Sequence, residues 1–480
     1  MESFIYHRSV PSFYVQNFGC RATQADGAAI ERQFAESGFD RATSASHAQV
    51  VILNTCTVTA AADQDARASI RRIHRSNPRC EIVVTGCYAQ RAPEEIAALP
   101  GVTRVIGNSH KHRLAEFVPL SSLTSEPGQQ IFVSDIFAHT ELLAAPVFEA
   151  DGGVDAKVRT RPNLKVQDGC NNRCSFCVIP SVRGQSRSLP LNQVLREVNG
   201  LVESGYREVV ISGINLGRWG RDLSHAGSRE LRTDNWSFPG GPSVSNQRRA
   251  ANDYRLEDLV RAILAETSLE KLRISSVEPM DWSDELIALT ASSARIAKHA
   301  HVPLQSGSDA VLRRMHRKYR PWHYRAKIEK IRAAIPMAAI GADVMVGFPG
   351  ETDAEFEETR RMIEGLPFTY LHVFTYSARP GTPAATLPYQ VPIRVGRDRN
   401  RILRELAAEK KQAFMRSFIG KPLPAITLNV SHRNSQGEFT EALTDNYLKL
   451  QLRGKHEPNR WIVAQVEAVA EGAMFGTCST

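Results

Sequence analysis

Three closely spaced cysteines, Cys170, Cys174 and Cys177, are the residues of this sequence best suited to chemistry. Three residues separate the first pair and two separate the second. Three thiolates on one short loop can ligate three irons of a cubic [4Fe–4S] cluster and leave the fourth iron without a protein ligand. An open iron lets a cluster bind a small molecule and pass it an electron. We therefore expect an electron-transferring cluster on this loop.

Zinc and a disulfide suit this loop less well than an iron–sulfur cluster does. Structural zinc needs a fourth ligand nearby, but no Cys or His follows within the next dozen residues. A disulfide does not suit an odd number of cysteines. A disulfide also needs an oxidising compartment, and Met1–Arg8 lacks the basic start and apolar core of a secretory signal that would direct the chain to one. A cysteine cluster without metal is the plain alternative. The eight cysteines of the chain thus indicate metal binding in a reducing cytoplasm.

The Cys-x3-Cys-x2-Cys pattern resembles the signature of radical S-adenosylmethionine (SAM) enzymes. In that superfamily the amino and carboxylate groups of SAM bind the open iron. An electron then cleaves SAM to methionine and a 5′-deoxyadenosyl radical. The resemblance therefore implies that SAM binds at the cluster of Cys170, Cys174 and Cys177.

A second set of cysteines, Cys20, Cys56 and Cys87, directly follows three predicted strands in the N-terminal region. These strands cover residues 12–18, 49–54 and 81–85, with helices at about 24–37 and 61–76 between them. Apolar strands joined by helices predict a parallel sheet covered on both faces, whose strand ends share one edge. We therefore expect these cysteines to form a second three-thiolate cluster site, although free Cys is often just a small buried residue. Cys80 precedes its strand and Cys478 is near the chain end, so both are predicted to be non-ligands.

From residue 159 the chain repeats strand and helix signals six times. Six repeats are fewer than the eight of a full barrel and predict a partial (β/α)6 barrel with its site at the C-terminal strand ends. The expected strands are 162–167, 208–213, 271–276, 299–304, 340–347 and 371–376, and the expected helices include 191–203, 257–266, 284–291, 323–334 and 353–365.

Polar and glycine-rich segments follow the strands of this partial barrel. Glycines let the backbone approach a ligand closely, and Ser, Gln and Glu side chains can bind ribose, carboxylate and amine groups. Each segment alone is an ordinary turn, but together they predict a cradle for SAM. The predicted cradle consists of Ser212, Gly213, Ser275, Glu278, Gln305, Ser306 and Gly347.

The chain is basic, with a net charge of +9 and a pI near 9.2. This charge favours an anionic partner such as nucleic acid, although a merely basic protein is the alternative. Arg313–Arg320 and Arg394–Arg416 are the densest basic stretches, and the second has a helical pattern that could follow phosphates or simply face solvent. No apolar run approaches the roughly 18 residues of a membrane span, so we expect a cytoplasmic protein without a membrane partner.

Beyond these motifs, the chain resembles the radical SAM methylthiotransferase family over nearly its whole length. The motifs are most similar to the branch that modifies N6-threonylcarbamoyladenosine next to the anticodon of tRNA. They are Asn54–Thr59, Val83–Gln90, Val166–Cys174 and His372–Thr382. The resemblance implies an α/β protein with a parallel-sheet N-terminal domain, a central partial (β/α)6 radical SAM barrel and a small C-terminal TRAM-type β-barrel.

The expected domain boundaries follow from these changes in pattern. A polar insertion at 221–253 lacks apolar periodicity and is predicted to be a flexible surface loop, with substrate contact as the alternative. Short strand signals at 423–430, 438–442, 447–452 and 462–469 predict the C-terminal β-barrel, which either binds RNA or is a structural cap. The ranges are 12–118 for the cluster domain, 119–158 for a linker with a strand at 130–133, 159–390 for the radical SAM barrel, 391–420 for a basic helical connector and 421–480 for the β-barrel.

The resemblance also implies a mechanism with two [4Fe–4S] clusters and two uses of SAM. One SAM methylates a sulfur held at the auxiliary cluster of Cys20, Cys56 and Cys87, and the second is cleaved at the other cluster. A methylthio group then replaces the C2 hydrogen of the adenine. The implied partners are the tRNA anticodon stem-loop, a sulfur donor and an electron donor such as flavodoxin or ferredoxin.

Three hypotheses about function therefore compete. The first is a tRNA methylthiotransferase that acts on N6-threonylcarbamoyladenosine. The second keeps the enzyme class but moves the substrate to isopentenyladenosine in tRNA or to an aspartate of a ribosomal protein. The third is a non-catalytic iron–sulfur protein that binds RNA or acts as a sensor. The basic charge favours tRNA, and two clusters with open sites favour an enzyme over a sensor.

Overall fold

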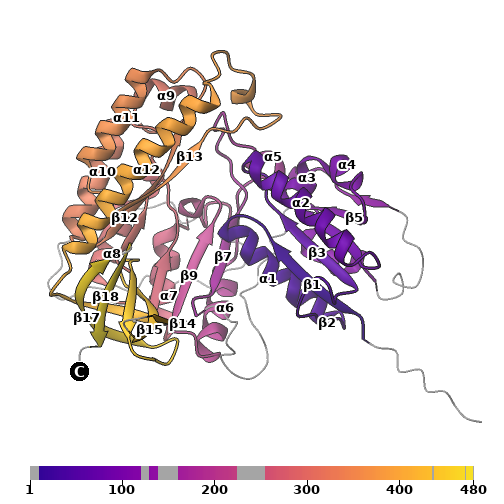
Figure 1. Ribbon diagram of the computed structural model, residues 1–480, viewed down its shortest axis with the longest axis horizontal. Helices are drawn as coiled ribbons and strands as arrows, with labels where there is room; N and C mark the ends of the chain where they lie inside the picture. Colours follow the sequence, from indigo (N-terminus) through magenta and orange to yellow (C-terminus); the bar gives the residue numbers. More distant parts are fainter. Residues whose placement is uncertain are drawn as a thin grey trace, which may run out of the picture.

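The computed structural model describes residues 10–119, 129–138, 160–223, 254–434, 437–470 and 472–478. It contains an N-terminal parallel sheet, a central half-barrel and a small C-terminal β-barrel (Figure 1). This arrangement confirms the fold class expected from the sequence. Most of the predicted linker and residues 224–253 of the predicted insertion lie outside the described residues. Among the helices that are described, none has the length and apolar character needed to cross a membrane.

The N-terminal unit is a six-stranded sheet in the order β2-β1-β3-β4-β5-β6, with every neighbouring pair parallel. β3 and β4 are buried along their whole length, as continuous apolar strands predict. Separate cores on the two faces hold α1 on one side and α2 to α4 on the other. The elements are β1 (Ser12–Asn17), α1 (Arg21–Glu36), β2 (Asp40–Arg41), β3 (Val50–Thr55), α2 (Ala60–Ser76), β4 (Glu81–Gly86), α3 (Cys87–Arg91), α4 (Pro93–Ala97), β5 (Val102–Gly107), η1 (Lys111–Phe117) and β6 (Gln130–Phe132).

The half-barrel contains all six strands that the sequence predicts for it. β7, β9 and β10 are parallel neighbours, as are β11, β12 and β13, and a parallel bridge between Ser276 and His301 joins the two sheets. The strands are β7 (Asn163–Asp168), β8 (Arg187–Ser188, antiparallel to β7), β9 (Glu208–Gly213), β10 (Lys271–Ile274), β11 (His299–His301), β12 (Ala339–Val346) and β13 (Tyr370–Thr375).

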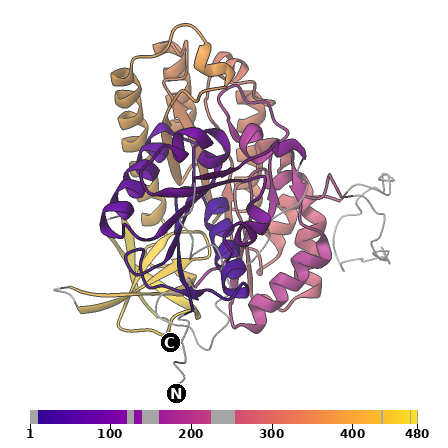
Figure 2. The same cartoon turned by 90° about the vertical axis from the view of Figure 1, so that its right-hand side faces the viewer.

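Helices connect these strands and cover the outside of the half-barrel (Figures 1 and 2). Local signals explain several of their starts, for example the capping box that Thr352 and Glu355 form at the first turn of α11. The helices are η3 (Ile136–Ala138), α5 (Ile179–Arg183), α6 (Leu191–Glu203), η4 (Leu216–Arg218), α7 (Leu256–Glu266), η5 (Pro279–Asp281), α8 (Asp284–Ser292), α9 (Asp309–Arg314), α10 (Pro321–Ala334), α11 (Asp353–Gly365) and η6 (Pro383–Thr386).

The C-terminal unit is a closed barrel of five strands in the order β14-β15-β16-β18-β17. The sequence pattern does not predict the last strand, β18, because its residues show little alternation of polar and apolar side chains. The strands are β14 (Pro422–Asn434), β15 (Gly437–Thr444), β16 (Lys449–Arg453), β17 (Trp461–Ala470) and β18 (Ala473–Cys478). Lys271, at the start of β10, lies 3.1 Å from Asp445, and Asn446 donates to the carbonyl of Met337 just before β12. The closed barrel therefore packs at the N-terminal ends of the half-barrel strands.

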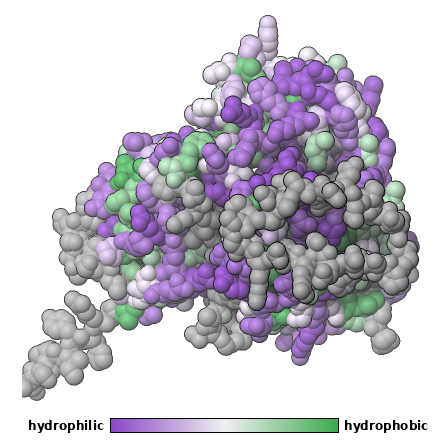
Figure 3. Space-filling view, turned by 180° about the vertical axis from the view of Figure 1, so that it is seen from behind, coloured by the Kyte–Doolittle hydropathy of each residue, from purple (hydrophilic) through white to green (hydrophobic). Residues whose placement is uncertain are grey.

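The N-terminal unit packs against the β7 side of the half-barrel, where α1 contacts β7 (Figures 1 and 2). α12 (Ile393–Arg416) runs from the C-terminal strand ends of the half-barrel to the closed barrel (Figure 1). The face opposite to that of Figure 1 is mainly hydrophilic where described residues are visible, with apolar side chains in small separate areas (Figure 3). The described residues that are visible on that face therefore show no broad apolar surface.

Two observations refine the sequence expectations. β6 lies in the range predicted as a linker, yet it pairs with β5 as the edge strand of the N-terminal sheet. Arg399 was expected on the exposed basic stripe of α12, but it is 5% exposed and bonds to Glu351 and Asp353. The basic stripe is therefore narrower than the helical pattern suggests.

Candidate active site

The loop that follows β7 carries Cys170, Cys174 and Cys177, and polar groups surround their sulfur atoms. The backbone N–H of Asn172 lies 3.4 Å from Cys170 Sγ, and the Asn215 side chain lies 3.6 Å from the same sulfur. Arg317 Nη1 lies 3.2 Å from Cys174 Sγ. N–H groups directed at sulfur stabilise a thiolate, which is the form of Cys that binds iron.

Cys20, Cys56 and Cys87 lie at one edge of the N-terminal sheet. Asn17 pairs with Asn54, and Thr55 pairs with Gly86, so β1, β3 and β4 end side by side. A Cβ added at Gly19 would lie 2.4 Å from the Cβ of Cys56, which shows how closely these two loops approach. Cys20 precedes the 16 residues of α1, and a helix N-terminus favours a thiolate.

The surroundings of these thiols fit iron–sulfur clusters better than a single metal ion. Within the described ranges, no three Cys, His, Asp or Glu side chains converge tightly enough to hold one ion. In a cubic cluster each thiolate binds its own iron, so the three sulfurs need not meet at one point. The donor set of each triad is purely sulfur, which iron–sulfur clusters prefer.

The pKa values show that the cysteines of each triad influence one another. Burial, and then the neighbouring sulfurs of Cys87 and Cys20, raise the pKa of Cys56 to about 11. Removal from water also raises the pKa of Cys177 to about 12, with further contributions from Cys174 and Cys170. The bare thiolates of Cys56 and Cys177 are therefore unfavourable, and metal binding must release the protons of these two thiols.

The motif His372–Thr382 forms a contact between the half-barrel and the N-terminal unit. Arg379 Nη2 donates to Asp63 Oδ2 at 2.9 Å, and Asp63 Oδ1 accepts a 2.7 Å bond from Thr57, the residue after Cys56. The backbone N–H of Ala60 also lies 3.2 Å from Ser377 Oγ. These contacts hold the loop after β13 against the Cys56 loop.

The residues of the predicted SAM cradle lie in different surroundings. Gly213 lies against Gln167, and Ser212 Oγ is buried without a partner among the described residues. Ser275 is buried near the end of β10, while Gln305 has a φ of 63° and bridges to Val344.

The other cradle residues differ in what they contact. Ser306 is fully buried and bonds to Thr359 on α11 at 3.0 Å, so its hydroxyl supports the helix instead of facing an open space. Gly347 packs against Gly396 of α12. Glu278 forms an ion pair with Arg317 and lines a pocket beside Cys174. The cradle stays a prediction, and the geometry favours Glu278 among its members.

A groove passes around the Cys170 loop through two adjoining pockets that share Asn172, Arg218 and Lys318. The basic patch at 313–320 borders this groove, but Arg313, Arg314 and Arg320 have carboxylate partners outside it. Lys318 is the exposed cation of the patch that lines both pockets. The residues that line the groove are Asn171, Asn172, Cys174, Ser186, Asn215, Arg218, Arg221, Asp222, Glu278, Met280, Asp281, His316, Arg317 and Lys318.

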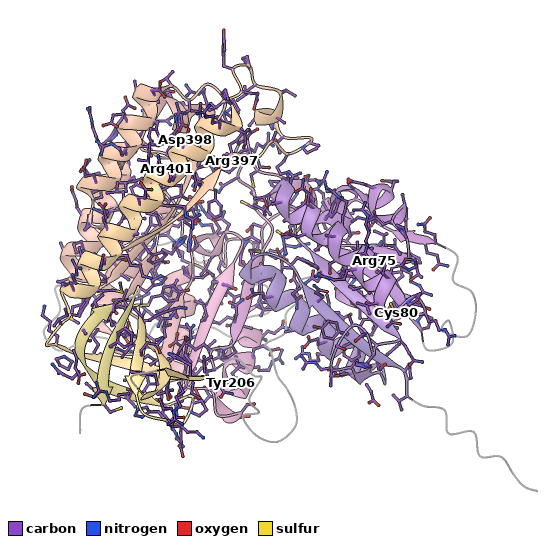
Figure 4. All side chains as sticks on the ribbon, in the orientation of Figure 1. Arg75, Cys80, Tyr206, Arg397, Asp398 and Arg401 are labelled. Carbon is purple, nitrogen blue, oxygen red and sulfur yellow. The ribbon has the colours of Figure 1, made fainter. Side chains whose placement is uncertain are left out.

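Cys80 and Cys478 lie apart from both triads. Cys80 is 8% exposed within the apolar core beside α2, and Figure 4 shows it on the part of the N-terminal unit away from the half-barrel. Cys478 ends β18, with its sulfur 3.8 Å from His456 Nδ1. Their positions agree with their predicted role as non-ligands, which stays a prediction.

Two units of the chain match family models. Residues 12–107 match Uncharacterized protein family UPF0004, and residues 164–363 match the Radical SAM superfamily. The fold is also similar to that of a radical S-adenosylmethionine methyltransferase, TsrM from Kitasatospora setae. The TM-score is 0.54 and the identity 16%, and the match covers 78% of this chain and 75% of TsrM. At that identity the likeness concerns the fold alone.

Relatives that are similar over most of the chain narrow the class of radical SAM protein to which it belongs. Threonylcarbamoyladenosine tRNA methylthiotransferase MtaB of Bacillus subtilis is 34% identical, covering 92% of this chain and 90% of the relative. The protein of the same name from Aquifex aeolicus is 33% identical, and the match covers 93% of this chain and 98% of the relative. The tRNA-2-methylthio-N(6)-dimethylallyladenosine synthase of Novosphingobium aromaticivorans is 33% identical over 86% of each chain. The chain belongs to the radical SAM methylthiotransferase family, which confirms the resemblance of its motifs.

Proposed function

We propose that the protein is a tRNA methylthiotransferase that replaces the C2 hydrogen of N6-threonylcarbamoyladenosine with a methylthio group. The target is the adenosine on the 3′ side of the anticodon. The arrangement of two separate three-cysteine sets on adjoining units carries this proposal, because methylthiolation needs both a radical and a sulfur source. The names of the relatives from Bacillus subtilis and Aquifex aeolicus support the choice of nucleoside.

Two [4Fe–4S] clusters and SAM supply the radical and sulfur chemistry when they are bound, and the chain's own residues hold and shield them. Cys170, Cys174 and Cys177 would bind one cluster, and Cys20, Cys56 and Cys87 would bind the other. Glu278, which is paired with Arg317, places a carboxylate beside Cys174, and this suits the amino group of SAM. Lys318 places an exposed cation on the rim of the groove, where it could meet the phosphate beside an unstacked loop base, while Arg218 is paired with Asp281.

The remaining partners follow from this reaction. An electron donor such as flavodoxin or ferredoxin must reduce the radical-forming cluster, and a sulfur donor must restore the auxiliary one. The anticodon stem-loop of tRNA supplies the target base, and the net charge of +9 favours its approach. A tRNA substrate and the eight cysteines favour the cytoplasm as the place of action.

Anaerobic reconstitution followed by single-turnover assays tests the proposed function. The reconstituted protein should bind about eight irons, from two cubes of four. With dithionite it should cleave SAM, and nucleoside mass spectrometry should detect the methylthio product in tRNA that carries N6-threonylcarbamoyladenosine. A chain that binds a single cluster, or that cleaves SAM but leaves the tRNA unchanged, would contradict the proposal.

A dimethylallyladenosine substrate is the second candidate, because the relative from Novosphingobium aromaticivorans is about as similar as the others. Competition between the two modified tRNAs in one reaction separates these possibilities. We expect product from the threonylcarbamoyl substrate, and preferential reaction of the isopentenyl substrate would reverse the assignment. The names of these relatives give no support for a ribosomal protein as substrate or for a non-catalytic sensor.

A further inference from the structure

Five buried charged side chains lie between the two cysteine triads and form what we term the interdomain charge network. Its members are at most 6% exposed and come from α1, η1, β7 and α5. They are Asp26, Lys111, Lys165, Asp168 and Arg183. Burying isolated charges is costly, so a connected group of five at a domain boundary calls for a physical reason.

Arg183 is the centre of this network. Its Nη1 donates to both carboxylate oxygens of Asp168 at 2.9 and 3.0 Å, and its Nη2 donates to Asp26 at 3.0 Å. Lys165 Nζ bonds to the carboxylates of both Asp26 and Asp168, and its distance to Asp168 Oδ2 is 2.8 Å. Lys111 lies 3.1 Å from Asp26. The carboxylate of Asp26 on α1 therefore joins the N-terminal unit to Lys165 and Arg183 of the half-barrel.

The segment Val182–Gly184 connects this network with both triads. Val182 packs against Cys87, and the Asn108 side chain contacts both the Val182 carbonyl, at 2.7 Å, and Cys87 Sγ, at 3.6 Å. Gly184 accepts a 3.1 Å hydrogen bond from the backbone N–H of Cys170. Three consecutive residues thus touch one cysteine of each triad, with Arg183 in the middle.

The charges of the network do not cancel. Three basic and two acidic groups leave one net positive charge when all five are ionised. Arg183 Nε is buried and has no hydrogen-bond partner in the described part of the chain. Although burial opposes its charge, Asp168, the Cys87 sulfur, Asp26 and the Cys20 sulfur together keep the pKa of Arg183 well above its ordinary value. An uncompensated positive charge therefore acts on the sulfurs at the N-terminal edge.

We propose that the interdomain charge network positions the two cluster sites relative to each other and stabilises the reduced, more negative form of the cluster at Cys20, Cys56 and Cys87. This inference rests on the proposed function, in which both triads bind clusters. Nearby positive charge and N–H donors raise the reduction potential of an iron–sulfur cluster. Arg183 is a positioning residue in this account, because it acts through the cluster site and not on the tRNA.

Redox titration of the auxiliary cluster tests the role of charge. The full chain with Cys170, Cys174 and Cys177 changed to alanine should bind the auxiliary cluster alone. In that background Arg183→Gln should lower the midpoint potential followed by electron paramagnetic resonance, because it removes a positive charge. Asp26→Asn should raise it, because it removes a negative one. Arg196→Gln removes an exposed charge from α6 and should leave the potential unchanged.

Positioning is tested in the chain with all its cysteines. Arg183→Gln should reduce methylthiolation by about 10- to 100-fold, as loss of a residue supporting a metal site typically does. Arg183→Lys keeps the charge but cannot bond to two carboxylates with the same fork. It should therefore keep a potential close to that of the unsubstituted protein while losing part of the methylthiolation.

Opposite shifts of the midpoint potential in Arg183→Gln and Asp26→Asn distinguish an electrostatic role of the network from general damage to the fold. Equal potentials in all variants, shifts in the same direction or equal loss of cluster in Arg183→Gln and Asp26→Asn would overturn the inference. Failure of the proposed function would instead appear in the unsubstituted chain, as a single cluster or unmodified tRNA. Normal two-cluster methylthiolation with indifferent Arg183 variants would overturn the network's role alone.

Discussion

Single cysteines distinguish the two candidate cluster sites, because the triads lie on different units of the fold. Cys56→Ala should lower bound iron from about eight to about four per chain and abolish methylthiolation, while SAM cleavage continues. Cys174→Ala should lower iron by the same amount and abolish both activities. Iron analysis, 5′-deoxyadenosine assays and nucleoside mass spectrometry measure these effects.

Cys80→Ala is the matched control for these changes. Cys80 is buried like Cys56, but it lies just before β4, whereas Cys56 lies just after the neighbouring parallel strand β3, so the two are at opposite edges of the sheet. Its substitution should leave iron content and both activities unchanged. Loss of SAM cleavage in Cys56→Ala, or loss of a cluster in Cys80→Ala, would show that the ligands are assigned incorrectly.

Asp26 should make the contact between the two units sensitive to acid. Burial alone would raise the pKa of Asp26, but Lys111, Lys165 and Arg183 hold it well below its ordinary value of 3.8. A depressed pKa in the folded state stabilises the fold above the ordinary value, and this stabilisation disappears as the pH falls toward the folded-state pKa. The melting temperature should therefore exceed that of Asp26→Asn by a constant margin from about pH 5 to 8, because the carboxylate is fully ionised there.

Differential scanning calorimetry of the cluster-free proteins measures this margin. It should shrink below about pH 4, where Asp26 begins to be protonated in the unfolded chain. Over the same acid range the difference between Arg196→Gln and the unsubstituted protein should change much less, because Arg196 is exposed on α6 and water screens its attraction for Glu197. A margin that grows toward low pH would contradict the sign of the pKa shift.

At the scale of elements, the loop after β7 depends on close backbone packing. Gly169 has a φ of 69°, and a Cβ at this position would lie 1.9 Å from the carbonyl oxygen of Gln185. Gly169→Ala should therefore displace the Cys170 loop, lower bound iron from about eight to about four and abolish SAM cleavage. Iron analysis and a SAM cleavage assay measure the effect.

Gly205→Ala is the matched control, since Gly205 also has a positive φ, of 89°, but has no atom within 4 Å of the added Cβ. It should cost only the strain of the backbone conformation, roughly 1 kcal/mol, and retain both clusters. A Gly169→Ala protein with full iron and normal SAM cleavage would show that the close packing of this loop is dispensable.

Periodic elements could be predicted from the sequence, and contacts between distant segments could not. The ranges of α6 and α11 agree with the pattern to the residue, because apolar periodicity and end signals coincide there. The two-residue strands β2 and β8 are too short to produce a periodic signal. Their existence depends on neighbouring strands, which a pattern along one segment does not contain.

The same limit applies to the site. The six cysteines could be assigned from their spacing and from their places after strands, whereas Asp26 and Arg183 are 157 positions apart and show no local motif. One feature of the sequence does point to the charge network. Lys165 and Asp168 are charged residues in a strand that is buried along its whole length. Buried charges of this kind predict partners, although not which ones.

At the scale of the whole molecule, the cysteine edge and the closed barrel lie at opposite ends of the half-barrel strands. α12 connects these ends and, with 24 residues, spans about 36 Å. Arg394, Arg397 and Arg404 are exposed on it, without an ion-pair partner among the described residues, and Figure 4 shows Arg397 and Arg401 on the visible side of the helix. A long anionic substrate could therefore contact both ends along this helix.

Removal of these three arginines together should weaken tRNA binding. Each arginine that binds a phosphate should contribute about one unit to the salt dependence of binding, and removal of all three should reduce affinity by roughly 10-fold or more at physiological salt. Changing Arg71, Arg75 and Arg79 to glutamine removes the same charge from the N-terminal unit, where Figure 4 shows Arg75. Equal reductions of affinity in fluorescence anisotropy titrations of the two triple variants would contradict a specific role for α12.

The central claim is that this chain methylthiolates N6-threonylcarbamoyladenosine in tRNA, and nucleoside mass spectrometry tests it most directly. Transfer RNA from a strain that lacks the gene should contain N6-threonylcarbamoyladenosine without its 2-methylthio derivative. A plasmid copy of the gene should restore the derivative, and a Cys56→Ala copy should not. Unchanged amounts of the 2-methylthio derivative in the strain without the gene would contradict the claim.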